Sequence, residues 1–297
     1  MWNEPLDNLR IGESNREMKN TKQCALAREM LVFLEGSPLT PDLQWTKDWD
    51  FLYHFEAERH LIVCEMLTKA GIHPDQPLNV LDFGFLHGLT QEFLHRAYPK
   101  SQTTVYDIPS SPIFGDKDYL EAINKRGYMR LLPGSIDEIG SDAARYDVII
   151  LGEIIEHLDP TQVARAFANL KKVASSKCLL VITTPNAAGL YNCWMTLKQR
   201  APIQAPPIPD KTFGYGHIHL WSLDLVRQTA EHYGWTFLDA QFYHGREGEM
   251  FEEVRSAWVG ISAQINVRLL KLLASKYPKF RGFFVAAFTV KDSPSQD

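Results

Sequence analysis

After Pro77, short apolar runs alternate with amphipathic segments, and this alternation constrains the fold more than any other feature of the chain. A strand followed by a helix and a second strand forms a parallel sheet with right-handed crossovers. Helices cover both faces of such a sheet, so its strands read as continuous apolar runs. The pattern predicts an α/β fold with strands at 79–83, 103–106, 128–132, 147–151 and 178–183, and helices at 90–98, 118–125 and 161–174.

The two ends of the chain differ from this middle part. Residues 1–20 are polar and aperiodic. The remaining residues of the two ends are predicted to form helices at 23–34, 47–70, 223–233 and 250–275 and strands at 236–242 and 282–290. The stretch 186–216 is too long for a bare connection and contains a Pro-rich segment, so we expect it to form a lid. We therefore divide the chain into an N-terminal tail and helical cap, 1–76, and an α/β domain, 77–297.

Charge and cysteine content narrow the class of protein. Lys and Arg number 31 against 36 Asp and Glu, a net charge of −5, so no overall basic field recruits nucleic acid. The four cysteines are scattered without a CxxC pair, which argues against a cysteine zinc site. The N-terminus lacks the layout of a signal peptide, and no apolar run has the length of a membrane span. We expect a reduced, soluble, cytoplasmic protein without a membrane partner.

The first predicted strand ends in a glycine-bearing turn. Asp82 and Gly84 close the strand, and Gly88 precedes the next helix. A strand, a Gly turn and a helix in this order cradle nucleotides at the carboxyl edge of a parallel sheet. Gly84 permits a tight turn, and Gly88 permits close packing of the helix. The same glycines also occur in turns that bind no ligand, so this motif alone leaves both interpretations open.

The second predicted strand ends in Asp107, about 25 residues after Asp82. An acidic side chain at this position accepts hydrogen bonds from both hydroxyls of a ribose. An isolated Asp at a strand end is otherwise a helix cap or a turn former. Its place after the glycine turn favours the ribose-binding interpretation.

Three further motifs follow in order. The fourth strand continues into Gly152-Glu153-Ile154-Ile155-Glu156-His157-Leu158, the fifth ends in Thr184-Pro185-Asn186, and His217-Ile218-His219-Leu220-Trp221-Ser222 precedes a helix. Together with the glycine turn and Asp107, these motifs span roughly 79–243. The series resembles the class I S-adenosylmethionine-dependent methyltransferases, and within them the small-molecule branch that includes the ubiquinone-biosynthesis O-methyltransferases.

This resemblance implies a Rossmann-like, seven-stranded, mostly parallel sheet whose last strand is antiparallel and inserted between the fifth and sixth. The cofactor, S-adenosylmethionine, would lie over the carboxyl ends of the first, second and fourth strands. The cofactor-binding residues would be Asp82, Gly84, Gly88, Asp107, Ile108, Ser135, Ile136 and Gly152.

One residue departs from the pattern of that group. The first motif of these enzymes usually has a middle glycine where this chain has Leu86. A leucine at the closest approach to the cofactor points away or narrows the pocket, which leaves a non-catalytic binding protein open as an alternative. A nicotinamide dehydrogenase is disfavoured because G-x-G-x-x-G is absent.

Methyl transfer from a sulfonium mainly requires alignment of the acceptor with the methyl group and exclusion of water. A base is needed only when the acceptor arrives protonated, as a hydroxyl does. We expect Glu153, His157 and His217 to be the catalytic residues, chosen from a wider set that also includes Glu156 and His219. The expected substrate is a small organic acceptor that takes the methyl group on oxygen, or alternatively on nitrogen, and that the lid encloses with aromatic residues of the N-terminal helices.

A metal site is the main competing interpretation. Glu153, Glu156 and His157 lie at i, i+3 and i+4, so a helical turn would place them on one face. The resemblance supplies a precedent, because small-RNA 3′-terminal 2′-O-methyltransferases combine an E-x-x-E-H segment with a later His, matched here by His217. The E-H-L segment also occurs in metal-free relatives, and histidines are not ligands that magnesium favours. We therefore expect no metal, and RNA methylation stays an alternative.

Overall fold

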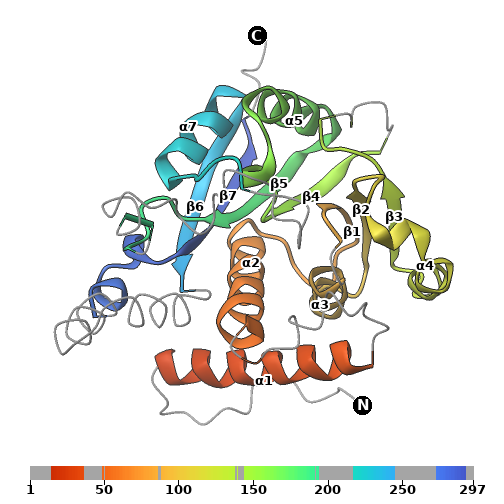
Figure 1. Cartoon of the computed structure of the whole chain (residues 1–297), viewed down its shortest axis with the longest axis horizontal. Helices are drawn as coiled ribbons and strands as arrows, with labels where there is room; N and C mark the ends of the chain where they lie inside the picture. The colour runs from red at the N-terminus through yellow and green to blue at the C-terminus, as the bar shows by residue number, and fades with distance from the viewer. Residues whose placement is uncertain are drawn as a thin grey trace.

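The computed structural model describes residues 15–36, 49, 51–85, 88–137, 139, 144–190, 192–193, 217–244 and 272–291. Its centre is one seven-stranded sheet with the order β3-β2-β1-β4-β5-β7-β6 (Figure 1). The strands are β1 (Leu78–Phe83), β2 (Ser101–Asp107), β3 (Met129–Pro133), β4 (Tyr146–Gly152), β5 (Ala174–Pro185), β6 (Trp235–Tyr243) and β7 (Phe283–Val290).

Strand direction confirms the expected topology. The pairs β1–β2, β1–β4, β2–β3 and β4–β5 are parallel, whereas β7 runs antiparallel to both β5 and β6. The strand order reverses between β1 and β4, and open parallel sheets bind ligands at the carboxyl ends of the strands at such a switch point. The edge above β1, β2 and β4 is therefore where a ligand site is expected.

Helices cover both faces of the sheet, with α1, α2 and α3 on one side and α5 and α7 on the other (Figure 1). Successive side chains of a strand point to opposite faces, which separates the core into two layers. Val80, Val148 and Val181 pack toward α1–α3, and their neighbours Leu81, Ile149 and Leu180 pack toward α5 and α7. The helical elements are α1 (Asn15–Glu35), η3 (Phe51–Ala57), α2 (Glu58–Lys69), α3 (Leu89–Ala97), η4 (Pro112–Gly115), α4 (Lys117–Asn124), η5 (Ile155–His157), α5 (Pro160–Val173), α7 (Leu223–His232) and η6 (Pro278–Phe280).

Helix caps fix the positions at which two loops of the site end. Asp159 accepts hydrogen bonds from the backbone N–H groups of Thr161 and Gln162 and forms a capping box at the start of α5. The Ser222 hydroxyl accepts the N–H of Leu225 at the start of α7. The loop after β4 and the loop before α7 thus end at defined positions.

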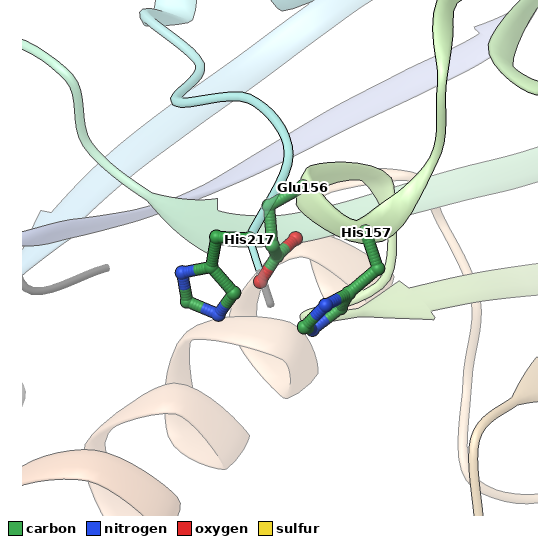
Figure 2. Close-up of side chains that lie close together, drawn as sticks. All are labelled: Glu156, His157 and His217. Carbon is green, nitrogen blue, oxygen red and sulfur yellow. The ribbon is translucent and has the colours of Figure 1, made fainter. Parts of the chain in front are cut away.

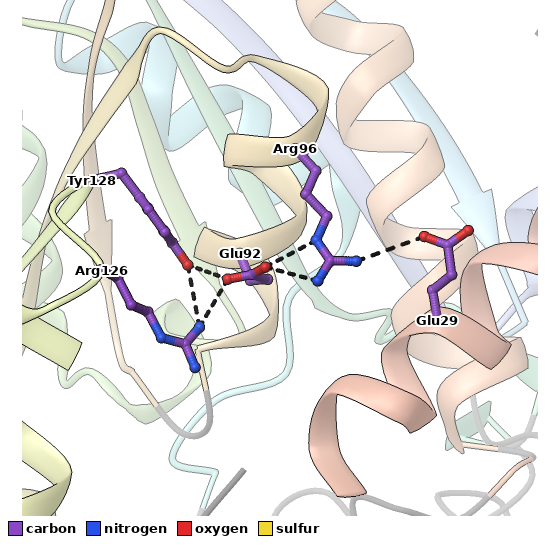
Figure 3. A network of polar contacts seen from close by, with 5 residues as sticks. All are labelled: Glu29, Glu92, Arg96, Arg126 and Tyr128. Carbon is purple, nitrogen blue, oxygen red and sulfur yellow. Dashed lines mark hydrogen bonds and ion pairs between the residues drawn. The ribbon is translucent and has the colours of Figure 1, made fainter. Parts of the chain in front are cut away.

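A polar network ties α1 to the sheet through α3 (Figure 3). Glu92 on α3 is its centre, because its carboxylate accepts hydrogen bonds from Arg96, Arg126 and Tyr128. Arg96 also lies 3.8 Å from the carboxylate of Glu29 on α1. The N-terminal helix is therefore linked to the helix that follows the glycine turn.

The N-terminal helices share a core with the sheet, since Met30, Leu34 and Met66 pack in the same cluster as strand residues. Two predicted elements differ: α1 begins at Asn15 instead of 23, and the helix expected at 47–70 contains a π-helical segment, η3, and is α-helical from Glu58. The boundary between 76 and 77 stays a prediction.

Parts of two predicted segments lie outside the described residues. These are 191 and 194–216 of the expected lid and 250–271 of the last expected helix, whereas 272–276 are helical. In the part of the chain that is described, no helix combines the length and apolar character that crossing a bilayer requires.

Candidate active site

The glycine turn lies where the ends of β1 and β4 meet. Gly84 has a φ of 77°, and a Cβ atom there would lie 3.0 Å from Cδ1 of Ile154. Its N–H donates to the carbonyl oxygen of Tyr106 at 2.9 Å. Gly84 is thus required both by its positive φ and by the closeness of the loop after β4.

Gly88 caps α3 with a φ of 76°, and a Cβ atom there would lie 2.8 Å from the ring of Phe85. The predicted reason for this glycine, close packing of the next helix, is therefore incomplete. The group that needs the space is the buried Phe85 side chain of the same turn. The departing residue Leu86 lies outside the described residues.

Asp107 joins the ends of three strands. Its carboxylate accepts the N–H of Phe85 at 3.1 Å and the N–H of Ile108 at 2.7 Å, and its carbonyl oxygen accepts the N–H of Gly134 at 2.8 Å. The Ser111 side chain is a third donor to this carboxylate. A carboxylate has about four lone-pair positions, so one remains for a ribose hydroxyl. The glycine turn and Asp107, separate in sequence, are direct neighbours in space.

The residues after β3 contribute unequally to this edge. The Ser135 hydroxyl donates to the carboxylate of Asp137, and both residues are half-buried. Ile136 is only 4% exposed and packs in the core, whereas Ile108 keeps part of its side chain at the surface. Ile108 therefore offers more apolar surface to an adenine ring than Ile136 does.

Asp82 lies beneath the glycine turn. Its side chain is buried and accepts the N–H of Phe83 at 2.8 Å and the side-chain amide of Gln91 at 2.7 Å. Burial raises the pKa of Asp82 to about 7. Because its carboxylate ties β1 to α3, its geometry fits support of the turn, and its direct contact with the cofactor stays a prediction.

Two glutamates after β4 are each held by a threonine of β5. The Thr183 hydroxyl donates to Glu153 at 2.8 Å, and the Thr184 hydroxyl donates to Glu156 at 3.0 Å. Burial raises the pKa of both glutamates, and Glu153 raises that of Glu156 further. Two adjacent buried carboxylates resist double ionisation, so the two glutamates do not lose their protons independently of each other.

The segment before α7 is fastened to the same turn. The carbonyl oxygen of Glu156 accepts the N–H of Ile218 at 2.7 Å, and the Trp221 indole donates to the carbonyl oxygen of Ile155 at 3.1 Å. This places the rings of His157 and His217 side by side, with centroids 4.7 Å apart (Figure 2).

Glu156, His157 and His217 form the group that could hold a metal ion. One ligand atom from each lies within 4.8 Å of the others. Among the described residues this is the one such group of three or more, and neither His219 nor Glu153 belongs to it. A site with one carboxylate and two imidazoles suits a transition metal or zinc better than magnesium.

Arg59, Glu56 and Tyr243, which interact electrostatically with Glu153, were not predicted from the sequence. Arg59 forms an ion pair of 2.6 Å with Glu56 and lies 5.0 Å from the ring centroid of Phe55. The Tyr243 hydroxyl is buried and has no hydrogen-bond partner among the described residues, and burial raises the pKa of Tyr243 well above its usual range. Glu56 and Arg59 stand in a polar stretch with Glu58 and His60, so no local pattern singled them out.

The strand order, the antiparallel β7 and the glycine turn beside an acidic strand end together define a Rossmann-like class I methyltransferase fold. Residues 55–240 match the family model described as a methyltransferase domain. This match covers more than half of the chain, and the chain belongs to that family.

Solved structures with the same fold differ widely in sequence. A proposed sarcosine dimethylglycine methyltransferase from Galdieria sulphuraria aligns with a TM-score of 0.52 and 15% identity over 90% of this chain and 99% of its own. Magnesium protoporphyrin IX methyltransferase from Synechocystis PCC 6803, with bound S-adenosylhomocysteine, aligns with a TM-score of 0.52 and 11% identity over 93% of this chain and 100% of its own. A 4+2 cyclase aligns with a TM-score of 0.51 and 12% identity over 95% of this chain and 98% of its own.

Identities this low support the fold alone. No curated protein sequence matches the chain significantly. The family match identifies the chain as an S-adenosylmethionine-dependent methyltransferase. The ubiquinone-type branch stays a prediction.

Proposed function

We propose that the enzyme transfers the methyl group of S-adenosylmethionine to an oxygen of a small organic acceptor. The observation that carries this proposal is the cluster of ionisable groups next to the cofactor edge, Glu153, Glu156, His157 and His217. A hydroxyl acceptor must lose its proton during transfer, whereas a neutral amine already has a free lone pair. A site with several potential bases therefore favours oxygen.

Each part of the site has a task in this proposal. Asp107 accepts the ribose hydroxyls, and the Gly84 turn leaves room for the rest of the cofactor. When bound, S-adenosylmethionine supplies a methyl group on a positive sulfur, which keeps the electron pair of the broken C–S bond. Glu153 faces the acceptor, and His157 or His217 takes the proton that the acceptor oxygen loses.

Aromatic residues of the N-terminal segment support an apolar or aromatic acceptor. The rings of Trp49 and Tyr53 stack with centroids 6.0 Å apart, and Trp49 remains 38% exposed. The free state of all four cysteines supports a reducing compartment, as proposed for a cytoplasmic enzyme.

A second candidate is metal-assisted methylation of the 2′-hydroxyl at an RNA 3′ end. The specific observation in its favour is the closeness of Glu156, His157 and His217. A bound metal lowers the pKa of a coordinated hydroxyl and so replaces a general base. We prefer the metal-free function because one carboxylate and two imidazoles make a poor magnesium site.

One assay separates the two candidates. The purified enzyme is given methyl-labelled S-adenosylmethionine with hydroxylated small molecules, matching amines or a short RNA, each in EDTA or in Mn²⁺. We expect transfer to a hydroxylated small molecule in EDTA, and a loss of about 10²–10⁴-fold in kcat for His157→Ala or His217→Ala. His232→Ala, an exposed histidine at the end of α7, is the matched control. Turnover only on RNA and only with metal would refute the preferred function.

A further inference from the structure

Glu153 has an unusual backbone conformation. Its φ is 57°, and among the described residues it is the one residue other than glycine with a positive φ. A residue with a Cβ atom is sterically strained at a positive φ, whereas glycine is not. Such strain persists where the surrounding structure enforces it, and it concentrates at functional sites.

Thr183 is the residue that enforces this conformation. Its carbonyl oxygen accepts the N–H of Glu153 at 3.0 Å, and its hydroxyl donates to the Glu153 carboxylate at 2.8 Å. Thr183 lies opposite Gly152 in the parallel pairing of β4 with β5. Both ends of Glu153, backbone and carboxylate, are thus held by one threonine on the neighbouring strand.

The surroundings leave the negative charge of Glu153 only partly compensated. Arg59 is the nearby cation, and its Nη2 is already 2.6 Å from Glu56. A Cβ atom at Gly152 would lie 3.6 Å from Nη1 of Arg59, so the guanidinium reaches this strand end without forming a direct bond to Glu153. A cation placed over the end of β4 would therefore find an oriented carboxylate.

We propose that Thr183 is a positioning residue that holds the Glu153 carboxylate against the sulfonium of S-adenosylmethionine, so that the enzyme prefers the charged cofactor to its neutral product. This inference rests on the proposed function, in which Glu153 faces the reacting groups. Sulfonium and sulfide differ by one charge, so an oriented carboxylate distinguishes them by electrostatic attraction. The attraction ends when the methyl group leaves, which favours release of S-adenosylhomocysteine.

The test compares binding of the two ligands and needs no acceptor. Calorimetry measures the affinities of S-adenosylmethionine and S-adenosylhomocysteine for wild type, Thr183→Val and Thr183→Ser. We expect Thr183→Val to lower the preference for S-adenosylmethionine about 10-fold, the usual size for a hydrogen bond to a charged group. Thr183→Ser keeps the hydroxyl and restores the preference. Thr289→Val is the matched control, because Thr289 lies on β7 opposite Leu179, away from the carboxyl end of β5, and this variant leaves the preference unchanged.

A second variant covers the case in which Thr183→Val does not fold. Glu153→Gly accepts the positive φ and removes the carboxylate, so we expect a midpoint of unfolding at or above that of wild type with the same loss of preference. Equal weakening of both ligands, or an unchanged ratio, would overturn the proposal. Absence of methyl transfer to any hydroxylated acceptor would refute the proposed function while leaving this binding ratio intact.

Discussion

At the scale of single residues, the site places acids where a sheet normally buries apolar side chains. Asp82 is 2% exposed, and Glu156 is fully buried. Each accepts a hydrogen bond from a neighbour, from Gln91 for Asp82 and from Thr184 for Glu156. These hydrogen bonds offset only part of the cost of removing a carboxylate from water. Such positions therefore make the free energy of unfolding depend on pH.

Asp82 gives the clearest pH dependence. Its pKa rises from 3.8 to about 7 on folding because the side chain is buried. The folded protein then binds more protons than the unfolded chain across this window, so stability is highest at the acidic end and is lost as pH rises through 7. The contribution is about 2–4 kcal/mol. We expect Asp82→Asn to flatten the profile of urea unfolding between pH 4 and 7. A wild-type profile that rises across this window, with Asp82→Asn following it, would contradict the assignment.

Gly88 and Gly127 form a matched pair that separates backbone strain from crowding. Both have a φ of 76°, but a Cβ atom at Gly127 would meet nothing within 4 Å, whereas one at Gly88 would meet Phe85 at 2.8 Å. Gly127→Ala should lower the free energy of unfolding by about 1 kcal/mol through backbone strain alone. Gly88→Ala adds overpacking and should cost about 2–4 kcal/mol. Urea titration measures both, and equal losses would show that the Phe85 ring moves aside freely.

At the scale of elements, α3 links the cofactor turn to the N-terminal helix. Gly88 caps its start, and its residues Glu92 and Arg96 form the network with Arg126 and Tyr128, which lie just before β3 (Figure 3). The carboxylate of Glu92 is 15% exposed, whereas the Arg96 side chain is 44% exposed. The contacts of this network therefore contribute unequally to the free energy of unfolding, because solvent screens the exposed ones more.

Glu92 should dominate this network. Glu92→Gln removes a charge that three donors share, so we expect a loss of about 1–2 kcal/mol and faster hydrogen exchange in α1. Glu29→Gln removes only the outer contact, 3.8 Å from Arg96, and should cost less than about 0.5 kcal/mol. Urea unfolding and hydrogen exchange of the two variants decide the point. A Glu29 effect as large as that of Glu92 would show that the network is not centred on α3.

At the scale of the whole molecule, the local pattern was enough to predict the architecture. Every strand of the sheet was expected within a few residues of its observed bounds, because continuous apolar runs in a covered sheet are a strong local signal. The position of the antiparallel strand followed from the family resemblance. The sequence did not predict that Thr183 would face Gly152, since that depends on the register of β4 against β5.

The sequence suggested the motifs of the candidate site but not the contacts that support them. Glu153, His157 and His217 were expected together, and the structure brings the two histidine rings side by side. The Thr183 contact with Glu153 was missed because it joins segments distant in sequence, and the burial of the Tyr243 hydroxyl was missed because it depends on tertiary packing. Such contacts leave no local period in the sequence and emerge only from tertiary packing.

The central claim, that S-adenosylmethionine binds across the carboxyl ends of β1, β2 and β4, is tested most directly by its affinity for Asp107→Ala. Calorimetry should show binding about 10–100-fold weaker than in wild type, since hydrogen bonds from ribose to a charged acceptor are lost. Asp239→Ala is the matched control, because Asp239 accepts the N–H of the next residue as Asp107 does but lies on β6 in an ion pair with Lys69. Its affinity should stay within about 2-fold of wild type. An unchanged affinity in Asp107→Ala would contradict this account.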